Sequence, residues 1–191
     1  NSDYFHLRSV DNDENWSLPA HLGPFYIDTT SPSPVTGLVS TSHSTGQNKW
    51  SQSNTIEISW TPAQDATSGL RGYSYLWDTS ESTLPPESVN LGWAMTAISS
   101  ETLPDGQWYF HLRGVDVAGN WNSEAKHLGP FGIDTQPPGP PNDLMSSSHQ
   151  IEIWSNQDEI NLSWKPAEDE GSGIAGYLAL WDTSDETVPT I

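Results

Sequence analysis

The sequence has no cysteine and few basic residues. Its 191 residues include six Lys and Arg against 25 Asp and Glu, which gives a formal net charge of −19. Without cysteine there is no disulfide framework and no thiolate nucleophile or metal ligand. So many carboxylates and so few cations would repel the phosphates of nucleic acid and the anionic surface of a bilayer. We therefore expect no nucleic acid among the partners of this protein, and no direct membrane insertion.

Long apolar runs are missing as well. No stretch reaches the roughly 18 to 20 apolar residues of a membrane-spanning helix. Aromatic residues, in contrast, are plentiful, with ten Trp, six Tyr and four Phe. Disordered acidic chains are poor in aromatic side chains, so this composition indicates a chain that folds around buried rings.

The sequence repeats itself with a period of about 105 residues, which identifies a tandem array. The clearest matches are YFHLR at 4–8 and 109–113, HLGPF at 21–25 and 127–131, and WDTS at 77–80 and 181–184. In this frame residues 1–30 are the C-terminal part of one repeat and residues 31–135 are a complete repeat. Residues 136–191 are the N-terminal part of a following repeat.

The two partial repeats have two interpretations. In the first, the chain is a piece of a longer tandem array. In the second, residues 1–30 complete residues 136–191 of the same chain or of a neighbouring chain by strand addition, as exposed sheet edges allow.

Within the complete repeat, apolar residues alternate with polar ones, and Gly, Pro, Asn and Asp separate the runs. This period of two predicts strands and no helix. The faces expected to point inward carry Ile56, Ile58 and Trp60 in residues 55–60, Tyr73, Tyr75 and Trp77 in residues 72–78, and Trp108, Phe110 and Leu112 in residues 108–115. Trp164 and Trp181, which match Trp60 and Trp77, are expected in a core too. Short strands with frequent turns predict an all-β chain of tandem antiparallel Greek-key β-sandwiches.

Three motifs carry a resemblance to a known family. They are ISWTP at 58–62 with its repeat LSWKP at 162–166, GLRGYSYLW at 69–77, and LPDGQWY at 103–109 followed by DVAGN at 116–120. Together they resemble the fibronectin type III domain, in the form that bacteria string together in extracellular proteins, and the resemblance covers the whole chain. It implies an extracellular or cell-surface location. It also implies a tyrosine corner at Tyr109, whose hydroxyl would bond to backbone a few residues upstream.

The resemblance further implies that two loops meet the connector from the preceding repeat. One loop holds Asp65, the other holds Asp116 and Asn120, and the connector carries Asp28. Three carboxylates and an amide oxygen would suit Ca²⁺, which prefers oxygen ligands. The alternative is that Asp116 and Asn120 cap their own turn and that Asp65 caps its own loop. Calcium is thus the one cofactor that the sequence suggests.

Trp16 and Trp121 occupy matching loop positions in two repeats. An indole in such a loop either stacks on a sugar ring or a partner's surface, or covers the base of the loop. The repeated histidines, His6 with His111 and His21 with His127, recur as packing residues do, and their spacing suggests no metal cage.

No catalytic motif is present, so we expect no enzyme. The leading interpretation is a non-enzymatic structural, spacer or adhesive segment of a bacterial surface, sheath or filament protein, in which Pro-rich connectors at 28–34 and 134–141 limit bending. Its partners would be neighbouring repeats or like subunits, with carbohydrate or another surface protein as ligands. One alternative is an accessory carbohydrate-binding or spacer module of a secreted hydrolase. Another is the subunit of a polymer formed by strand complementation.

Overall fold

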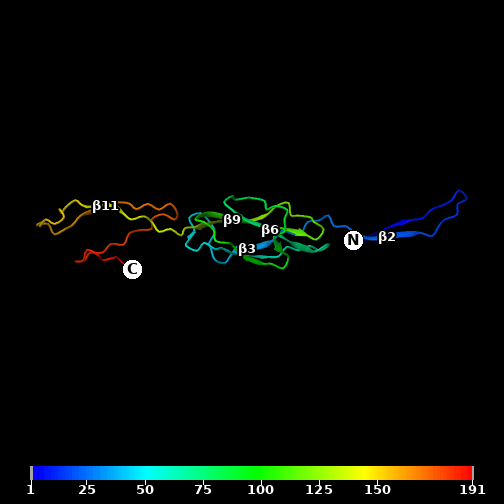
Figure 1. Cartoon of the computed structure of the whole chain (residues 1–191), viewed down its shortest axis with the longest axis horizontal. Coiled ribbons are helices and arrows are strands. Elements are labelled where there is room, and N and C mark those ends of the chain that lie inside the picture. The colour runs from blue at the N-terminus through cyan, green and yellow to red at the C-terminus, as the bar shows by residue number, and fades with distance from the viewer. Residues whose placement is uncertain (1, 191) are drawn as a thin grey trace.

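The computed structural model describes residues 2–190, an elongated chain of strands and loops. Strands β1 (Ser2–Leu7) and β2 (Ala20–Tyr26) form a hairpin at one end of the molecule, and β11 (Asn142–Ser146) pairs with β12 (Leu162–Lys165) at the other end (Figure 1). Two sheets lie between them. The prediction of an all-β chain is confirmed. Within residues 2–190 no helix is long and apolar enough to span a bilayer.

The central part consists of two sheets. The smaller has the order β3-β5-β8, and the larger has the order β4-β10-β9-β6-β7. Their bounds are β3 (Thr36–Ser40), β4 (Trp50–Ser51), β5 (Glu57–Thr61), β6 (Leu70–Asp78), β7 (Leu91–Gly92), β8 (Ala97–Ser99), β9 (Gly106–Asp116) and β10 (Lys126–Ile133). All pairs are antiparallel except β4 with β10, which is parallel.

The two central sheets enclose one core. The smaller sheet contributes Ile58 and Trp60, which lie on β5, and Ile56, which directly precedes it. All three are buried, as their alternation predicts. The larger sheet adds fully buried aromatic rings, among them Tyr73 and Phe110. The Trp60 ring lies edge-on to Tyr73, with 5.8 Å between the ring centroids, a geometry that aromatic pairs favour.

Three expectations from the sequence differ from the structure. From Phe110 onward strand β9 is buried on both faces, because neighbouring segments also cover His111 and Arg113. The hydroxyl that accepts an upstream backbone N–H belongs to Tyr73 and not to Tyr109: Ala63 donates to it at 3.2 Å. Trp164 and Trp181, predicted in a core, are 43% and 66% exposed.

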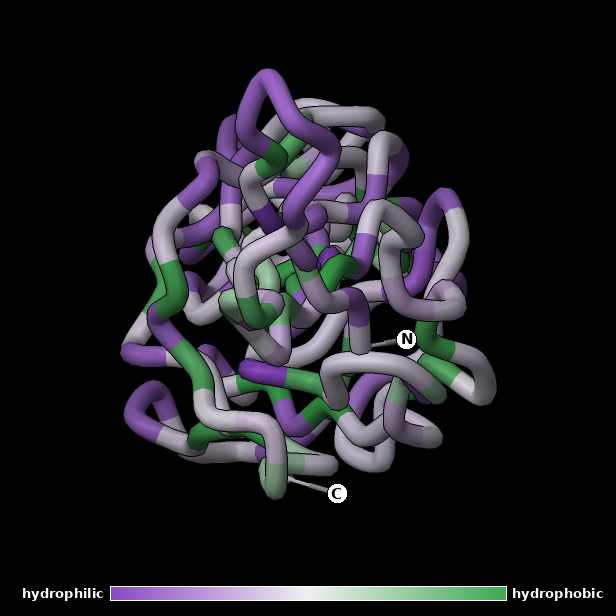
Figure 2. The backbone as a smooth tube through the Cα atoms, turned by 90° about the vertical axis from the view of Figure 1, so that its right-hand side faces the viewer, coloured by the Kyte–Doolittle hydropathy of each residue, from purple (hydrophilic) through white to green (hydrophobic). Residues whose placement is uncertain are grey.

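The apolar residues follow the strands in short stretches. Figure 2 views the molecule end-on, and its tube changes repeatedly between hydrophobic and hydrophilic colours without a long hydrophobic run. This is the pattern of half-buried strands, in which one face meets a core and the other meets solvent.

The two partial repeats lie at opposite ends of the molecule, on either side of the complete one (Figure 1). Among the elements of residues 2–190, β1 and β2 contact each other, and so do β11 and β12, but neither pair contacts the other or the central sheets. The structure therefore does not show completion of one partial repeat by the other within a single chain.

Candidate functional site at the joint between repeats

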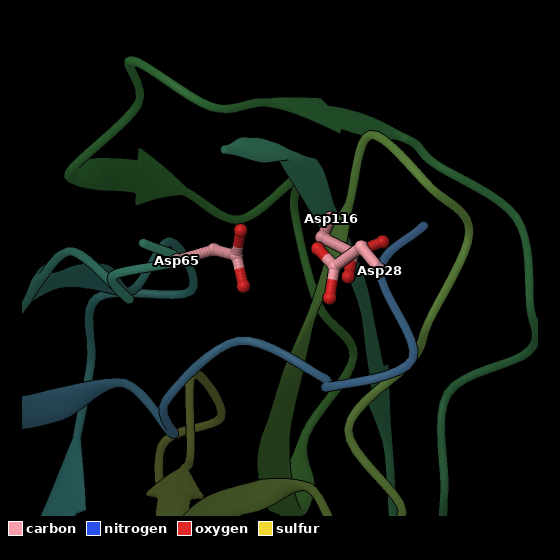
Figure 3. A group of neighbouring side chains, drawn as sticks. All are labelled: Asp28, Asp65 and Asp116. Carbon is pink, nitrogen blue, oxygen red and sulfur yellow. The ribbon is translucent and has the colours of Figure 1, made fainter. Parts of the chain in front are cut away.

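Three carboxylates converge where the connector after β2 reaches the central sheets. Asp28 lies on the connector, Asp65 in the loop between β5 and β6, and Asp116 at the end of β9. One carboxylate oxygen from each lies within 4.8 Å of the other two. Figure 3 shows Asp28 and Asp116 side by side, with the carboxylate of Asp65 turned toward them from the facing loop. The structure thus brings together the three acidic residues predicted from the sequence.

Asp65 shapes its own loop. Its Oδ1 accepts the backbone N–H groups of Thr67, Ser68 and Gly69 at 3.1, 2.9 and 2.7 Å. Gly69 has φ +86, a conformation that glycine adopts at little cost. The capping role proposed for Asp65 is confirmed by these bonds.

Asp116 caps the turn that follows β9. Its Oδ1 accepts the backbone N–H groups of Gly119 and Asn120 at 2.7 and 2.8 Å, and its Oδ2 accepts the side-chain amide of Asn120 at 2.7 Å. The side chain of Asp116 is buried. A buried carboxylate needs such donors because burial otherwise disfavours its charge.

Asn120 acts as a hydrogen-bond donor at this site. Its Nδ2 donates to the Asp28 carbonyl oxygen at 3.1 Å and to Asp116 Oδ2. Both partners are pure acceptors, so the amide nitrogen must be the atom that faces them. The amide oxygen of Asn120, which was expected to be a cation ligand, is therefore not the atom that faces the carboxylates.

Asp28 ties the connector to the central sheets. Its Oδ2 accepts the backbone N–H of Ser68 at 3.1 Å, and its Oδ1 accepts that of Thr30 at 3.0 Å. Hydrogen bonds from the Ser68 side chain and the Thr30 backbone hold the pKa of Asp28 below its usual value. The carboxylate is therefore charged at neutral pH and fixed to residues on both sides of the joint.

The second joint repeats this arrangement. Asp134 Oδ2 accepts the backbone N–H of Ser172 at 2.7 Å, and its Oδ1 accepts that of Gln136 at 3.2 Å. Hydrogen bonds from the Ser172 side chain and backbone lower the pKa of Asp134, as those at the first joint lower that of Asp28. Asp169, which matches Asp65, accepts the N–H of Gly173 at 2.7 Å.

The carboxylate oxygens of the first joint could act as ligands of a metal cation. Each carboxylate keeps lone pairs beyond those used by N–H donors, and Ca²⁺ binds oxygens at about 2.3 to 2.6 Å. A cation there would offset the repulsion among three negative charges. The hydrogen bonds confirm the capping alternative, while calcium binding stays a prediction.

The two predicted binding tryptophans each lie beside an arginine. The guanidinium carbon of Arg113 is 5.0 Å from the Trp121 ring centroid, and that of Arg8 is 4.1 Å from the Trp16 ring. Trp121 is half-buried and pairs with Val115, whereas Trp16 is exposed. An arginine thus occupies one face of each indole.

The histidines form pairs that sequence reasoning missed. The Nδ1 atoms of His111 and His127 are 2.6 Å apart, and His111 Nε2 lies 3.0 Å from Asp78 Oδ1. His6 and His21 form the same contact at 2.6 Å. Each pair sits directly opposite in its hairpin. The sequence spacing of these histidines does not indicate the pairing, which depends on the register of the two strands in each hairpin.

Comparison with known proteins yields no family. No family model matches the chain, and no curated protein matches it. Among solved structures it is similar to the spore cortex lytic enzyme SleM of Clostridium perfringens, with 21% identity and a TM-score of 0.36. The match covers 52% of this chain and 28% of the SleM chain. A likeness of this extent does not assign the chain to a family.

Proposed function

We propose that this chain is a non-enzymatic repeat segment of a bacterial extracellular protein, with a structural or adhesive role at a surface, sheath or filament. The observation that carries the proposal is the joint that occurs twice. Asp28 with Ser68 and Asp134 with Ser172 fasten successive repeats by the same bond. The same hydrogen bond at each junction would fix the relative positions of neighbouring repeats, as expected of an array whose function depends on those positions.

The units are proposed to be fibronectin type III-like Greek-key sandwiches. The supporting observation is the strand order, with three strands in one sheet and β4-β10-β9-β6-β7 in the other, around a shared core. The motifs that carry the resemblance lie on β5, β6 and β9. A fold of this kind serves many roles, so the role is argued from the joints.

The joint would act mechanically by removing freedom from the connector. Besides the Asp28 bonds, Asn122 Nδ2 donates to the Pro32 carbonyl oxygen, and the Ser33 backbone N–H donates to the Gln64 carbonyl oxygen at 2.8 Å. Proline residues at 32 and 34 restrict the same segment. The array would then project its outer parts at a fixed distance and angle.

Two measurements test this proposal. Backbone ¹⁵N relaxation should show residues 29–34 as ordered as the central strands, and connector residues that move freely on the nanosecond timescale would contradict it. Antibodies against the complete repeat should label intact, unpermeabilised cells that produce the protein. Labelling confined to permeabilised cells would contradict the extracellular location.

A further inference from the structure

Two histidines of the complete repeat turn a ring nitrogen toward each other across neighbouring strands. His111 on β9 stands directly opposite His127 on β10, and their Nδ1 atoms are 2.6 Å apart. The rings cross at 69°, with 4.9 Å between their centroids. His111 lies on the face of β9 that points away from the core residues Phe110 and Leu112. Neither histidine belongs to a joint between repeats, so their role is independent of the proposed structural role.

Asp78 on β6 fixes the position of the proton on His111. Its Oδ1 lies 3.0 Å from His111 Nε2, and an ionised carboxylate can only accept a hydrogen bond. The proton of a neutral His111 is therefore on Nε2, and its Nδ1 carries a lone pair directed at His127. Because His111 is fully buried, bulk water does not compete for that lone pair.

This arrangement is the one found at histidines that bind metal ions. Such a histidine usually donates its second ring N–H to a carboxylate or another acceptor, which fixes the ring and makes the ligating nitrogen more basic. Imidazole nitrogens suit Zn²⁺ and bind it at about 2.0 to 2.1 Å, which puts two of them about 3.4 Å apart in a tetrahedral site. The two Nδ1 atoms would need to separate by less than about 1 Å to admit the ion. His127 is free to make this movement, since its side chain is exposed.

We propose that His111 and His127 bind a divalent transition-metal ion of the Zn²⁺ type through their Nδ1 atoms, with Asp78 as a positioning residue. The ion would take the place of the hydrogen between the two nitrogens. His127 would then carry its proton on Nε2, so binding to the neutral pair releases no net proton. Water would complete the coordination from the side where His127 is exposed. The ion would join β9 to β10 and stabilise the folded repeat by mass action.

The β1–β2 hairpin contains the same pair without the carboxylate. His6 and His21 stand opposite each other, with their Nδ1 atoms 2.6 Å apart and their ring centroids 4.8 Å apart. The bonds described for residues 2–190 give His6 no carboxylate partner. We therefore expect the hairpin pair to bind the ion about 10- to 100-fold more weakly, the usual effect of losing such a partner.

Calorimetric titration with Zn²⁺ tests the site. The background is His21→Asn, so that the hairpin pair does not contribute, and Ca²⁺ is present in excess to compete for carboxylate oxygens. We expect one ion per chain, and addition of His127→Asn should weaken binding at least about tenfold. His149→Asn is the matched control and should leave the affinity unchanged, because both ring nitrogens of His149 already bond to protein oxygens. No Zn²⁺ binding, or equal binding by the His127→Asn and His149→Asn proteins, would overturn the proposal.

Asp78→Asn tests the positioning role. The amide keeps an oxygen that can accept from His111 Nε2 but carries no charge, so the affinity for Zn²⁺ should fall about 10- to 100-fold. Unchanged affinity would show that Asp78 does not position the ligand.

The ¹⁵N spectrum of the imidazole rings identifies the ligating atoms directly. Zn²⁺ should shift the Nδ1 resonances of His111 and His127 and leave His111 Nε2 protonated. A loss of folding would instead change the backbone spectrum of the whole repeat. Coordination through His111 Nε2, or Nδ1 resonances that do not respond to Zn²⁺, would contradict the proposed site.

Discussion

The carboxylate of Asp134 accepts the backbone N–H of Ser172 at 2.7 Å, across 38 residues of sequence. Asp28 and Ser68 make the same contact 40 residues apart at the preceding joint. Each Asp lies just after the last strand of one repeat, and each Ser lies in the next repeat, in the loop that follows β5 or β12. The bond therefore joins neighbouring repeats to each other, and it occurs at both junctions that the chain contains.

Removing the Tyr73 hydroxyl is expected to destabilise the complete repeat. Tyr73→Phe leaves the buried Ala63 N–H without its partner, which costs about 1 to 3 kcal/mol of unfolding free energy. Tyr109→Phe is the matched control, and we expect a change within about 0.5 kcal/mol. Urea unfolding followed by tryptophan fluorescence measures both. A larger loss of unfolding free energy in Tyr109→Phe than in Tyr73→Phe would instead support a tyrosine corner at Tyr109, where the family resemblance places it.

The pH dependence of stability should report the His111–His127 pair. Burial, followed by the charges of His111 and Lys126, lowers the pKa of His127 below 6.5, while Asp78 acts in the opposite direction. A lowered histidine pKa means that the unfolded chain binds the proton more tightly. The contribution is thus complete above pH 6.5 and is lost as the pH falls below that value.

The corresponding measurement is urea unfolding at pH 7.5 and at pH 5.5. The wild-type chain should be less stable at the lower pH, and His127→Asn should show a smaller difference between the two. Carboxylates titrate mainly below this window. An identical pH dependence in the variant would show that His127 is not responsible.

We predict that the three carboxylates at the first joint bind Ca²⁺ and that the bound ion stabilises the joint. Millimolar Ca²⁺ should raise the Tm and EGTA should reverse the rise, because the ion offsets repulsion among Asp28, Asp65 and Asp116. Asp65→Asn keeps an oxygen for the loop N–H groups but removes one charge, so it should reduce the response. A Tm that neither Ca²⁺ nor EGTA changes would leave the carboxylates as turn caps alone.

Replacing Trp121 separates packing from ligand binding. Trp121→Ala is expected to lower the unfolding free energy by about 1 to 3 kcal/mol, since the half-buried ring packs on Arg113 beside an isolated backbone bridge to Val115. Trp93→Ala, at a position 63% exposed, is the control and should cost less. Retention on insoluble polysaccharides should be the same for all three proteins. Retention lost in Trp121→Ala alone, without loss of stability, would support the carbohydrate-binding alternative.

The repeat made much of the molecule predictable from its sequence. The alternation of apolar and polar residues predicted the inward face of β5. The repeat of about 105 residues showed that Asp134 is the counterpart of Asp28 in the next repeat. Local turn chemistry also allowed the capping roles of Asp65 and Asp116 to be anticipated, because these bonds run to residues at most four positions away.

Other features depend on segments that are distant in sequence. The histidine pairs follow from hairpin register, which a period of two does not specify. The orientation of Asn120 depends on a carbonyl oxygen 92 residues away, on Asp28. Trp164 was expected in a core because its motif matches that of Trp60, but burial also requires partner strands, and these are supplied only in the complete repeat.

The central claim is that the same bond fastens both joints, and an NMR pH titration of the Ser68 and Ser172 amides tests it most directly. Because both carboxylates have a lowered pKa, their contribution to stability is present above pH 3.8 and is lost as the pH falls through the folded-state pKa. Both amide resonances should therefore move with midpoints below 3.8. Asp28→Asn should reduce the shift at Ser68 without changing that at Ser172, because Asp65 Oδ1 also accepts the Ser68 N–H. Asp134→Asn should abolish the shift at Ser172 alone. Midpoints at or above 3.8, or amides that do not respond, would contradict the account.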